Sequence, residues 1–351
     1  MMVAMVLQPI VGFTSPPRWR PMRRVLQPSR GPHLQVGWRG RAGRGRSAGQ
    51  LLWCAFVLCA STQPAWAGAW TVPHNHWYIE YFYRLYQAKK DFDQDGHSSR
   101  KPKTASFRDI RNELKLEYGI TDWLNLLVSV PYQSAHYQDN GIDLLNSGVG
   151  DIYVRTKLRV LNLARDERSL VGSAQFSWKI PSAYDPHVSP GLGDGQVDFE
   201  SRLMLSASQV FEPYEVRVPV RSAPNATPQI EAQTRYAKVA FVNLEGGFNA
   251  RNEDPANEFP LVAEAGFTPI KRVMLVGSVE SVVSVNSTNE DIENFSKWGL
   301  RAIINLWGDG FATVFRTGDP TVNMEVGYND VLAGRNTGDA FEVFGKLSMS
   351  F

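Results

Sequence analysis

The stretch AFEVFGKLSMSF, residues 340–351, decides the fold of this chain because its side chains alternate between two faces. One face carries the apolar residues Phe341, Val343, Leu347, Met349 and Phe351. The other face carries Glu342, Lys346, Ser348 and Ser350. A period of two residues is the pattern of a β-strand whose two sides meet different surroundings. The chain therefore ends on a predicted strand with one apolar and one polar side.

The same alternation recurs along the chain in segments of about ten residues that polar turns separate. Around residues 110–118, for example, apolar residues alternate with Arg111, Glu113, Lys115 and Glu117. Including the last segment, we predict strands at 76–87, 110–118, 123–132, 151–161, 170–180, 196–208, 236–249, 259–267, 272–284, 296–307, 321–331 and 340–351. Repeated segments of this kind are typical of a β-barrel that crosses a membrane.

The alternative of membrane-spanning helices is excluded by hydropathy. Mean hydropathy is −0.27, and no stretch after residue 67 approaches the roughly 18 apolar residues that a spanning helix needs. We therefore predict an all-β fold, a transmembrane antiparallel up-and-down β-barrel of about 12 strands in the bacterial outer membrane. An even strand count places both ends of the barrel on the periplasmic side.

The connections between the predicted strands fall into two kinds. Tight joins at 119–122 and 268–271 are predicted periplasmic turns, and longer polar stretches are predicted extracellular loops at 88–106, 133–147, 181–195 and 286–295. One connection differs, because residues 209–233 contain Pro213, Pro219, Pro224 and Pro228, and proline disfavours a central strand. We predict a Pro-rich periplasmic insertion there, in which YEVRVPV (214–220) is a candidate for a short edge strand.

Residues 1–67 have the composition of a leader, and residues 68–351 are the predicted barrel. The first 50 residues contain nine arginines and no Asp, Glu or Lys, and the apolar run LLWCAFVLCA follows at 51–60. The triplet Ala65-Trp66-Ala67 before Gly68 completes the pattern of a cleaved secretory signal peptide. An organelle-targeting leader is the alternative, but such leaders are amphipathic and this apolar run is continuous.

Removal of this leader changes the charge and the cysteine count of the chain. The whole chain has 37 Lys and Arg, so loss of the nine arginines leaves 28 against 35 Asp and Glu, a formal charge of −7. That charge gives no support for a nucleic-acid partner. Both cysteines, Cys54 and Cys59, lie in the leader, which excludes disulfides and cysteine catalysis in the mature chain.

Several phrases resemble the outer membrane protein family of the MetA pathway of phenol degradation. They are SGVGDIYVRTKLRVL at 147–161, PGLGDGQVDFESRLML at 190–205, AFVNLEGGF at 240–248 and LAGRNTGDAFEVFGKLSMSF at 332–351. The resemblance implies a closed barrel and passage of small aromatic or hydrophobic molecules. The closing strand also resembles the C-terminal signal that the bacterial barrel-assembly machinery recognises, which would involve Leu347, Met349 and Phe351.

The polar faces of the predicted strands point into the lumen and form the candidate site. The lumen-lining candidates are Arg84, Arg111, Glu113, Lys115, Glu117, Arg155, Lys157, Arg159, Asp198, Glu200, Arg202 and Arg301. The aromatic candidates are Tyr78, Phe82, Tyr86 and Tyr153. Inward charges of both signs nearly balance, and only Arg155, Lys157 and Arg159 form a local excess. That run could attract an anionic solute, or it could pair with Asp198 and Glu200 across the lumen.

Other motifs give weaker indications of chemistry. Residues 91–96 (DFDQDG) match the first half of a calcium loop, but Pro102 stands where the ligating Glu is required. His97, His136 and His187 fall in three predicted loops, where they could share a metal or lie in solvent. Ser173 and Ser177 face the predicted lumen without a histidine placed to activate them. We predict no enzyme activity, no metal and no cofactor.

The sequence thus predicts an outer-membrane barrel whose partners are membrane lipids, the assembly machinery and a small solute. The first functional hypothesis is a narrow channel for passive uptake of small, aromatic or hydrophobic solutes. A side-chain-filled scaffold barrel that works through its surface loops is the second hypothesis. An outer-membrane lipid-modifying enzyme is the third.

Overall fold

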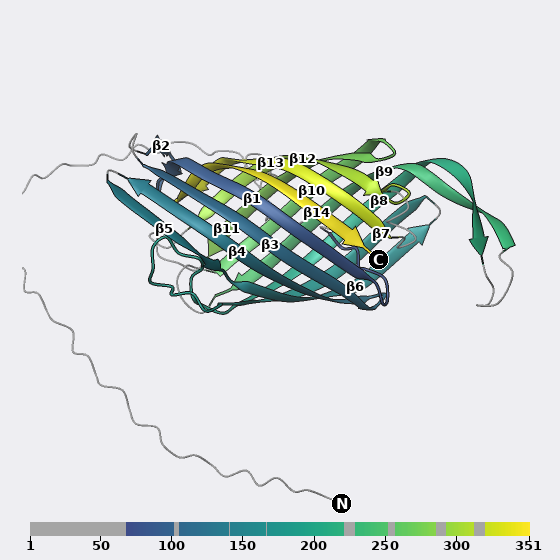
Figure 1. The fold of residues 1–351 in the computed structure, drawn as a ribbon, viewed down its shortest axis with the longest axis horizontal. Coiled ribbons are helices and arrows are strands. Elements are labelled where there is room, and N and C mark those ends of the chain that lie inside the picture. Colours follow the sequence, from purple (N-terminus) through teal and green to yellow (C-terminus); the bar gives the residue numbers. More distant parts are fainter. Residues whose placement is uncertain are drawn as a thin grey trace, which may run out of the picture. The chain divides into compact units, whose positions relative to one another are not determined.

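The described part of the chain is an all-β barrel of twelve antiparallel strands (Figure 1), which confirms the predicted fold and strand count. The computed structural model describes residues 68–101, 105–139, 141–165, 167–220, 229–251, 257–285, 293–311 and 320–351. The predicted leader, residues 1–67, lies outside the described residues. No helix within the described ranges is long and apolar enough to cross a bilayer.

The barrel strands follow one another around the wall in chain order. They are β1 (Trp77–Phe92), β3 (Ser106–Thr121), β4 (Leu124–Asp139), β6 (Ile152–Arg165), β7 (Arg168–Ile180), β8 (Asp198–Val220), β9 (Gln229–Ala250), β10 (Asn257–Ile270), β11 (Val273–Val285), β12 (Asn294–Trp307), β13 (Thr321–Arg335) and β14 (Thr337–Ser350). Two short strands, β2 (Ser98–Arg100) and β5 (Ile142–Val149), extend the hairpins beside β1 and β4.

The barrel closes where the last strand pairs with the first. Strand β14 pairs antiparallel with β1, from Tyr78 opposite Ser350 to Phe92 opposite Thr337. At the end of this seam, the Trp77 N–H donates to the Phe351 carbonyl at 2.8 Å, and the Phe351 N–H donates to the Trp77 carbonyl at 3.0 Å. Phe351 therefore completes the hydrogen-bonded wall, while its role as an assembly signal stays a prediction.

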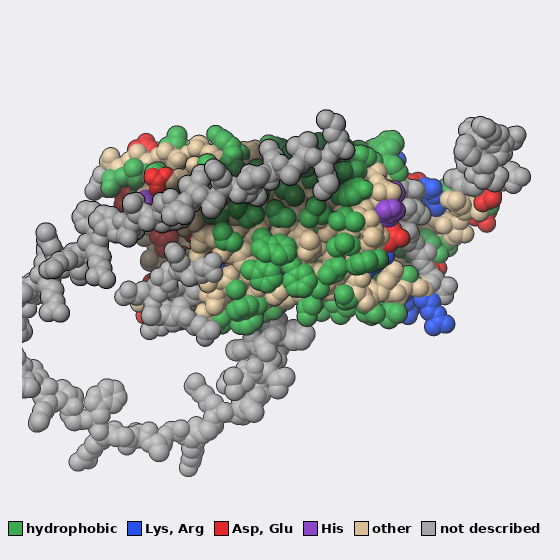
Figure 2. All heavy atoms as spheres, turned by 90° about the horizontal axis from the view of Figure 1, so that it is seen from below, with side chains coloured by type: hydrophobic (Ala, Val, Ile, Leu, Met, Phe, Trp, Pro, Cys, Tyr) green, Lys and Arg blue, Asp and Glu red, His purple; other side chains and the backbone are tan. Residues whose placement is uncertain are grey.

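The two faces of the wall divide as the alternation predicts. On β14, the outward Leu347 and Met349 are 44% and 38% exposed, whereas the inward Glu342, Lys346 and Ser348 are buried. Figure 2 shows apolar side chains gathered over the middle of the barrel surface, with charged side chains near its ends. A soluble barrel would bury its apolar face, so this inverted arrangement is typical of a barrel that spans a membrane.

The barrel has a turn end and a loop end. We call the end with the tight turns at 122–123 and 271–272 and with Phe351 the turn end, and the opposite end the loop end. The predicted loops at 88–106 and 133–147 begin too early, because β1 and β4 continue to Phe92 and Asp139, which places His136 on a strand. The apolar alternation ends at the expected boundary of the membrane. The strands continue beyond it, because main-chain pairing does not depend on apolar side chains.

The Pro-rich stretch forms an extension of the β8–β9 hairpin. Figure 1 shows this two-stranded ribbon projecting beyond the end of the barrel where the C-terminus lies. The candidate edge strand YEVRVPV belongs to β8 and pairs with β9, for example Tyr214 opposite Arg235. No described strand pairs with the other edge of this ribbon, and proline is tolerated on such edge strands, which accounts for Pro213 and Pro219.

Asp309 ties this ribbon to the turn end. Its carboxylate lies 2.5 Å from Arg235 Nη1 on β9 and 2.8 Å from Lys271 Nζ in the β10–β11 turn. Partial burial alone would raise the pKa of Asp309, but hydrogen bonds from Lys271 and Arg235 hold it below its usual value. A lowered pKa means that the contacts contribute stability above about pH 4 and lose it as the pH falls through the folded-state pKa.

Replacement of Asp309 by Asn should therefore loosen the ribbon. We expect D309N to be cleaved within residues 209–240 several times faster than wild type by a dilute protease, at every pH from 5 to 8. Wild type should show the same slow rate across that range, because Asp309 stays ionised throughout it. Limited proteolysis followed by mass spectrometry measures both rates, and equal cleavage of the two proteins would contradict this role of Asp309.

Candidate functional site in the barrel lumen

A cavity of about 410 Å³ lies inside the barrel. Its wall contains nine Lys and Arg side chains and nine Asp and Glu side chains, so the cavity is close to neutral. The charged residues come from the inward faces of strands all around the barrel and from the loop between β7 and β8. The polar face of the alternation thus lines an internal space near the loop end.

Eleven of the sixteen predicted lumen candidates line this cavity. They are Arg84, Arg111, Glu113, Lys115, Arg155, Asp198, Glu200, Arg202, Arg301, Phe82 and Tyr153. Of the other five, Tyr78, Glu117 and Lys157 are buried in the wall. Arg159 is half-buried at the turn end, where its N–H donates to the Trp123 carbonyl, and Tyr86 is half-buried with Arg84 Cζ 5.8 Å from its ring centroid.

Most lumen charges are held in ion pairs, mainly between neighbouring strands, and Glu264–Arg301 reaches from β10 to β12 across β11. The shortest of these contacts between side chains in the middle of the barrel are Glu280–Lys297 at 2.7 Å, Glu264–Arg301 at 2.9 Å, Glu325–Lys346 at 2.9 Å and Glu245–Arg202 at 3.0 Å. Such pairs fix the side chains of a charged wall, because an unpaired charge in a poorly hydrated interior is strongly disfavoured.

The structure also shows the contacts of Arg155, Lys157 and Arg159, which form the local excess of positive charge in the sequence. None of the three lies within 4.0 Å of an Asp198 or Glu200 oxygen, so the predicted alternative of ion pairs with these two residues is not formed, although Glu200 attracts Arg155 from farther away. Lys157 instead contacts Glu117 at 3.3 Å. Asp198 contacts Lys179 at 2.6 Å, and Glu200 contacts Arg202 at 2.9 Å. Lys157 lies opposite Asn125, whose side-chain amide donates to Glu117 at 2.7 Å, so these three side chains meet. Asp198 instead lies opposite Lys179.

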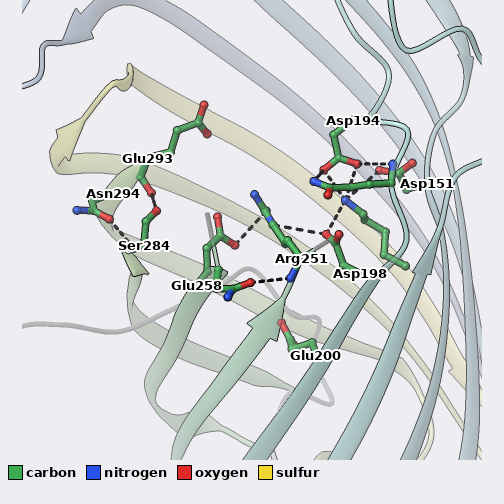
Figure 3. Close-up of polar contacts among 12 residues, drawn as sticks. Asp151, Asp194, Asp198, Glu200, Arg251, Glu258, Ser284, Glu293 and Asn294 are labelled. Atoms are coloured by element: carbon green, nitrogen blue, oxygen red, sulfur yellow. Dashed lines mark hydrogen bonds and ion pairs between the residues drawn. The ribbon is translucent and has the colours of Figure 1, made fainter. Parts of the chain in front are cut away.

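The loop between β7 and β8 is fixed against the loop end of the wall. Gln133 and Asn146 donate hydrogen bonds to the carbonyls of Leu192 and Pro190, and Tyr184 donates to Asp151. Lys179 donates to Asp194 and lies within 4.0 Å of Asp151 and Asp198. Figure 3 shows the carboxylates of Asp151, Asp194 and Asp198 close together. The loop therefore forms part of the cavity wall.

Two ionisable groups of this loop have shifted pKa values. Burial alone would raise the pKa of Asp194, but hydrogen bonds and the positive charge of Lys179 hold it below its usual value. The pKa of Tyr184 is raised by burial and by its hydrogen bond to the Asp151 carboxylate. At neutral pH, Asp194 is therefore ionised and Tyr184 is a neutral donor, which is the state that holds the loop in place.

Residues 68–76 enter the lumen from the turn end. The Gly68 N–H donates to Glu245 Oε1 at 2.9 Å, and the Ala69 N–H donates to Ser206 Oγ at 2.7 Å. The Trp70 carbonyl accepts from Lys157 Nζ at 3.1 Å. Ala69 is fully buried, and a side chain on Gly68 would collide with Ser206 and Asn243. The segment thus occupies the part of the lumen between the cavity and the turn end.

Trp70 of this segment packs against an apolar cluster that the sequence analysis did not predict. Its inward members are Val210, Val239, Phe241, Met274, Val276 and Ile303, joined by Phe311. The Trp70 ring packs edge-on against Phe241, with ring centroids 6.0 Å apart. The run Val273–Val276 is apolar on both faces, and this loss of alternation was the available indication that part of the lumen is packed.

The remaining candidate chemistry is not assembled. His97 and His136 contact the separate aspartates Asp93 and Asp143. No group of three or more His, Cys, Asp and Glu side chains in the described ranges is placed to hold a metal ion. Ser177 lines the cavity, but no histidine is among the described residues that line it, and Ser173 instead donates to the Ala69 carbonyl. An activated serine is therefore not formed there.

Comparison with known proteins gives a likeness of fold. No family model and no curated protein matches the chain. The solved COG4313 outer membrane channel from Pseudomonas putida F1 matches with 14% identity and a TM-score of 0.53, over 83% of this chain and 100% of that chain. The translocator domain of the autotransporter NalP from Neisseria meningitidis matches with 11% identity and a TM-score of 0.33, over 78% and 88%. The first match shows that the chain has the fold of an outer-membrane β-barrel.

Proposed function

We propose that the protein is an outer-membrane channel for passive uptake of small solutes. The observation that carries the proposal is the charged cavity inside a closed barrel whose outer face is apolar. A purely structural barrel of this size could fill its lumen with side chains. An internal cavity of about 410 Å³ is therefore not expected of such a barrel. The likeness of fold to a channel of Pseudomonas putida supports the proposal.

The resemblance to the MetA-pathway family supports aromatic or hydrophobic molecules as the solutes. No family model matches the chain, so this part of the proposal rests on the quoted sequence phrases and on the cavity. The cavity includes Phe82, Tyr153 and Phe344, whose rings offer apolar contact beside the charges. In the outer membrane the turn end would face the periplasm, with the β8–β9 ribbon projecting there.

Planar-bilayer recording of the purified protein tests the channel. We expect single-channel currents in potassium chloride, and we expect liposomes that contain the protein to swell in arabinose and in benzyl alcohol. Liposomes without protein provide the control for direct diffusion of benzyl alcohol through the lipid. Absence of both current and arabinose flux would contradict the proposal and favour a scaffold barrel that works through its loops.

A further inference from the structure

Two of the nine cations that line the cavity have no carboxylate partner among the described residues. Each of the other seven lies within 4.0 Å of a carboxylate oxygen. Within the described ranges, Lys115 makes no hydrogen bond and has no carboxylate oxygen within 4.0 Å of its Nζ, although Glu80 and Glu117 attract it from farther away. Its Nζ lies 5.8 Å from the centroid of the Tyr78 ring. Arg155 Nη1 donates to Ser129 Oγ at 2.9 Å, and its guanidinium carbon lies 4.7 Å from the centroid of the Tyr153 ring.

These two cations lie side by side on one wall of the lumen. Lys115 on β3 is opposite Ser129 on β4, and Ser129 is opposite Tyr153 on β6. Residues opposite each other on neighbouring strands have Cβ atoms only about 5 Å apart. Because the Arg155 guanidinium hydrogen-bonds the Ser129 hydroxyl, it reaches the strand next to Lys115. Both side chains line the same cavity and can therefore contact one ligand.

The charge of this wall matches a monoanion. The carboxylate next to Lys115 in the register is Glu80 on β1, which accepts a hydrogen bond from Tyr78 at 2.6 Å. Glu80 has no cation within 4.0 Å in the described part of the chain and attracts Lys115 and Lys346 only from farther away. At this place, two cations without a contacting carboxylate therefore face one such carboxylate, a local positive excess within a cavity whose charges balance as a whole. A buried charge without a partner is disfavoured, and one bound anion would balance it.

The surroundings of this wall favour an anion with an apolar body. Phe82 follows Glu80 by two residues on the same face of β1, and its ring lies 5.9 Å from that of Phe344. Pro260 and Val282 stand opposite each other on β10 and β11 and also line the cavity. A volume of about 410 Å³ falls within the roughly 300–1,000 Å³ of pockets that bind small molecules. Inorganic anions would leave these apolar surfaces without contact.

We infer that Lys115 and Arg155 bind the carboxylate of a small aromatic monocarboxylic acid inside the lumen. The planar guanidinium of Arg155 can hold two carboxylate oxygens, and the Lys115 ammonium can donate to one of them. The ring of the acid would lie against Phe82 and Tyr153. This inference rests on the proposed channel function and names the class of its solute.

Direct binding to the purified protein in detergent micelles tests the site. Benzoate is the probe, benzyl alcohol the neutral analogue and benzylammonium the cationic analogue, each measured by isothermal titration calorimetry. We expect benzoate to bind more tightly than either analogue. Lys115→Gln and Arg155→Gln should each weaken benzoate binding by about tenfold, since each removes a hydrogen bond to a charged group. Arg159→Gln removes the same charge outside the cavity and should leave benzoate binding unchanged.

The same experiment separates the site from the channel. Benzoate binding no tighter than that of benzyl alcohol, or full binding in the folded double variant, overturns the inference. Heat-dependent mobility on gels shows whether each variant is folded, and the single variants provide the result if the double variant is not. If wild type carries current but binds benzoate no more tightly than benzyl alcohol, the inference is wrong and the proposed channel is retained. If wild type binds benzoate but carries no current, the proposed channel is wrong and the binding site is retained.

Discussion

Deletion of residues 68–72 should enlarge the ionic current through the barrel. The main chain of this segment contacts Glu245, Ser206 and Lys157, and Trp70 packs against the apolar cluster at the turn end. Without the segment, water would reach these charges and join the cavity to the turn end. We expect single-channel conductance roughly two- to threefold above that of wild type, because conductance rises with the open cross-section.

The deletion should leave the barrel itself intact. The next residues keep their own anchors, because the Asn75 N–H donates to the Gly119 carbonyl and the Trp77 N–H to the Phe351 carbonyl. His74→Ala is the matched control, since His74 is an exposed residue of the same segment whose side chain lies outside the lumen. Equal conductance of the deletion, the control and wild type would show that the segment does not restrict the path.

Alternation alone predicted most of this fold. On β14 the apolar and polar positions fell on the outer and inner faces as expected, because a period of two fixes which face each side chain meets. The strand count followed from the same pattern. Strand lengths did not, since polar residues such as those at the end of β4 continue the ladder beyond the apolar band. Hydropathy therefore does not show where these strands end, because main-chain pairing does not depend on apolar side chains.

The candidate site was predictable as a set of residues but not as a set of contacts. The alternation of faces placed Arg155 and Lys157 in the lumen. Only the structure shows that Lys157 contacts Glu117 and that Arg155 has no carboxylate oxygen within 4.0 Å among the described residues. The position of residues 68–70 inside the lumen was not predictable either. Short segments such as GAW have no periodicity, and their position depends on partners more than 100 residues away.

Replacement of Glu325 by Gln should strongly destabilise the barrel. Glu325 Oε1 lies 2.9 Å from Lys346 Nζ and 3.5 Å from Arg301 Nε, and the side chains of all three residues are almost fully buried. The substitution leaves Lys346 without a carboxylate partner in the described part of the lumen, while Arg301 keeps Glu264. Removal of one partner from a buried ion pair costs about 3–5 kcal/mol, which we expect as the loss in free energy of unfolding.

Two further variants show whether the loss comes from the stranded charge. Glu113→Gln breaks the pair with Arg111, whose side chains are more exposed and line the cavity, and should cost less than E325Q because water can solvate the remaining charge. The double variant E325Q/K346Q removes both partners and should regain much of the stability that E325Q loses, because the ammonium that E325Q leaves unpaired at position 346 is then absent. Unfolding in guanidinium chloride, followed by tryptophan fluorescence in micelles, measures all four proteins. A double variant no more stable than E325Q would mean that packing around Glu325, and not charge balance, sets the stability of this part of the lumen.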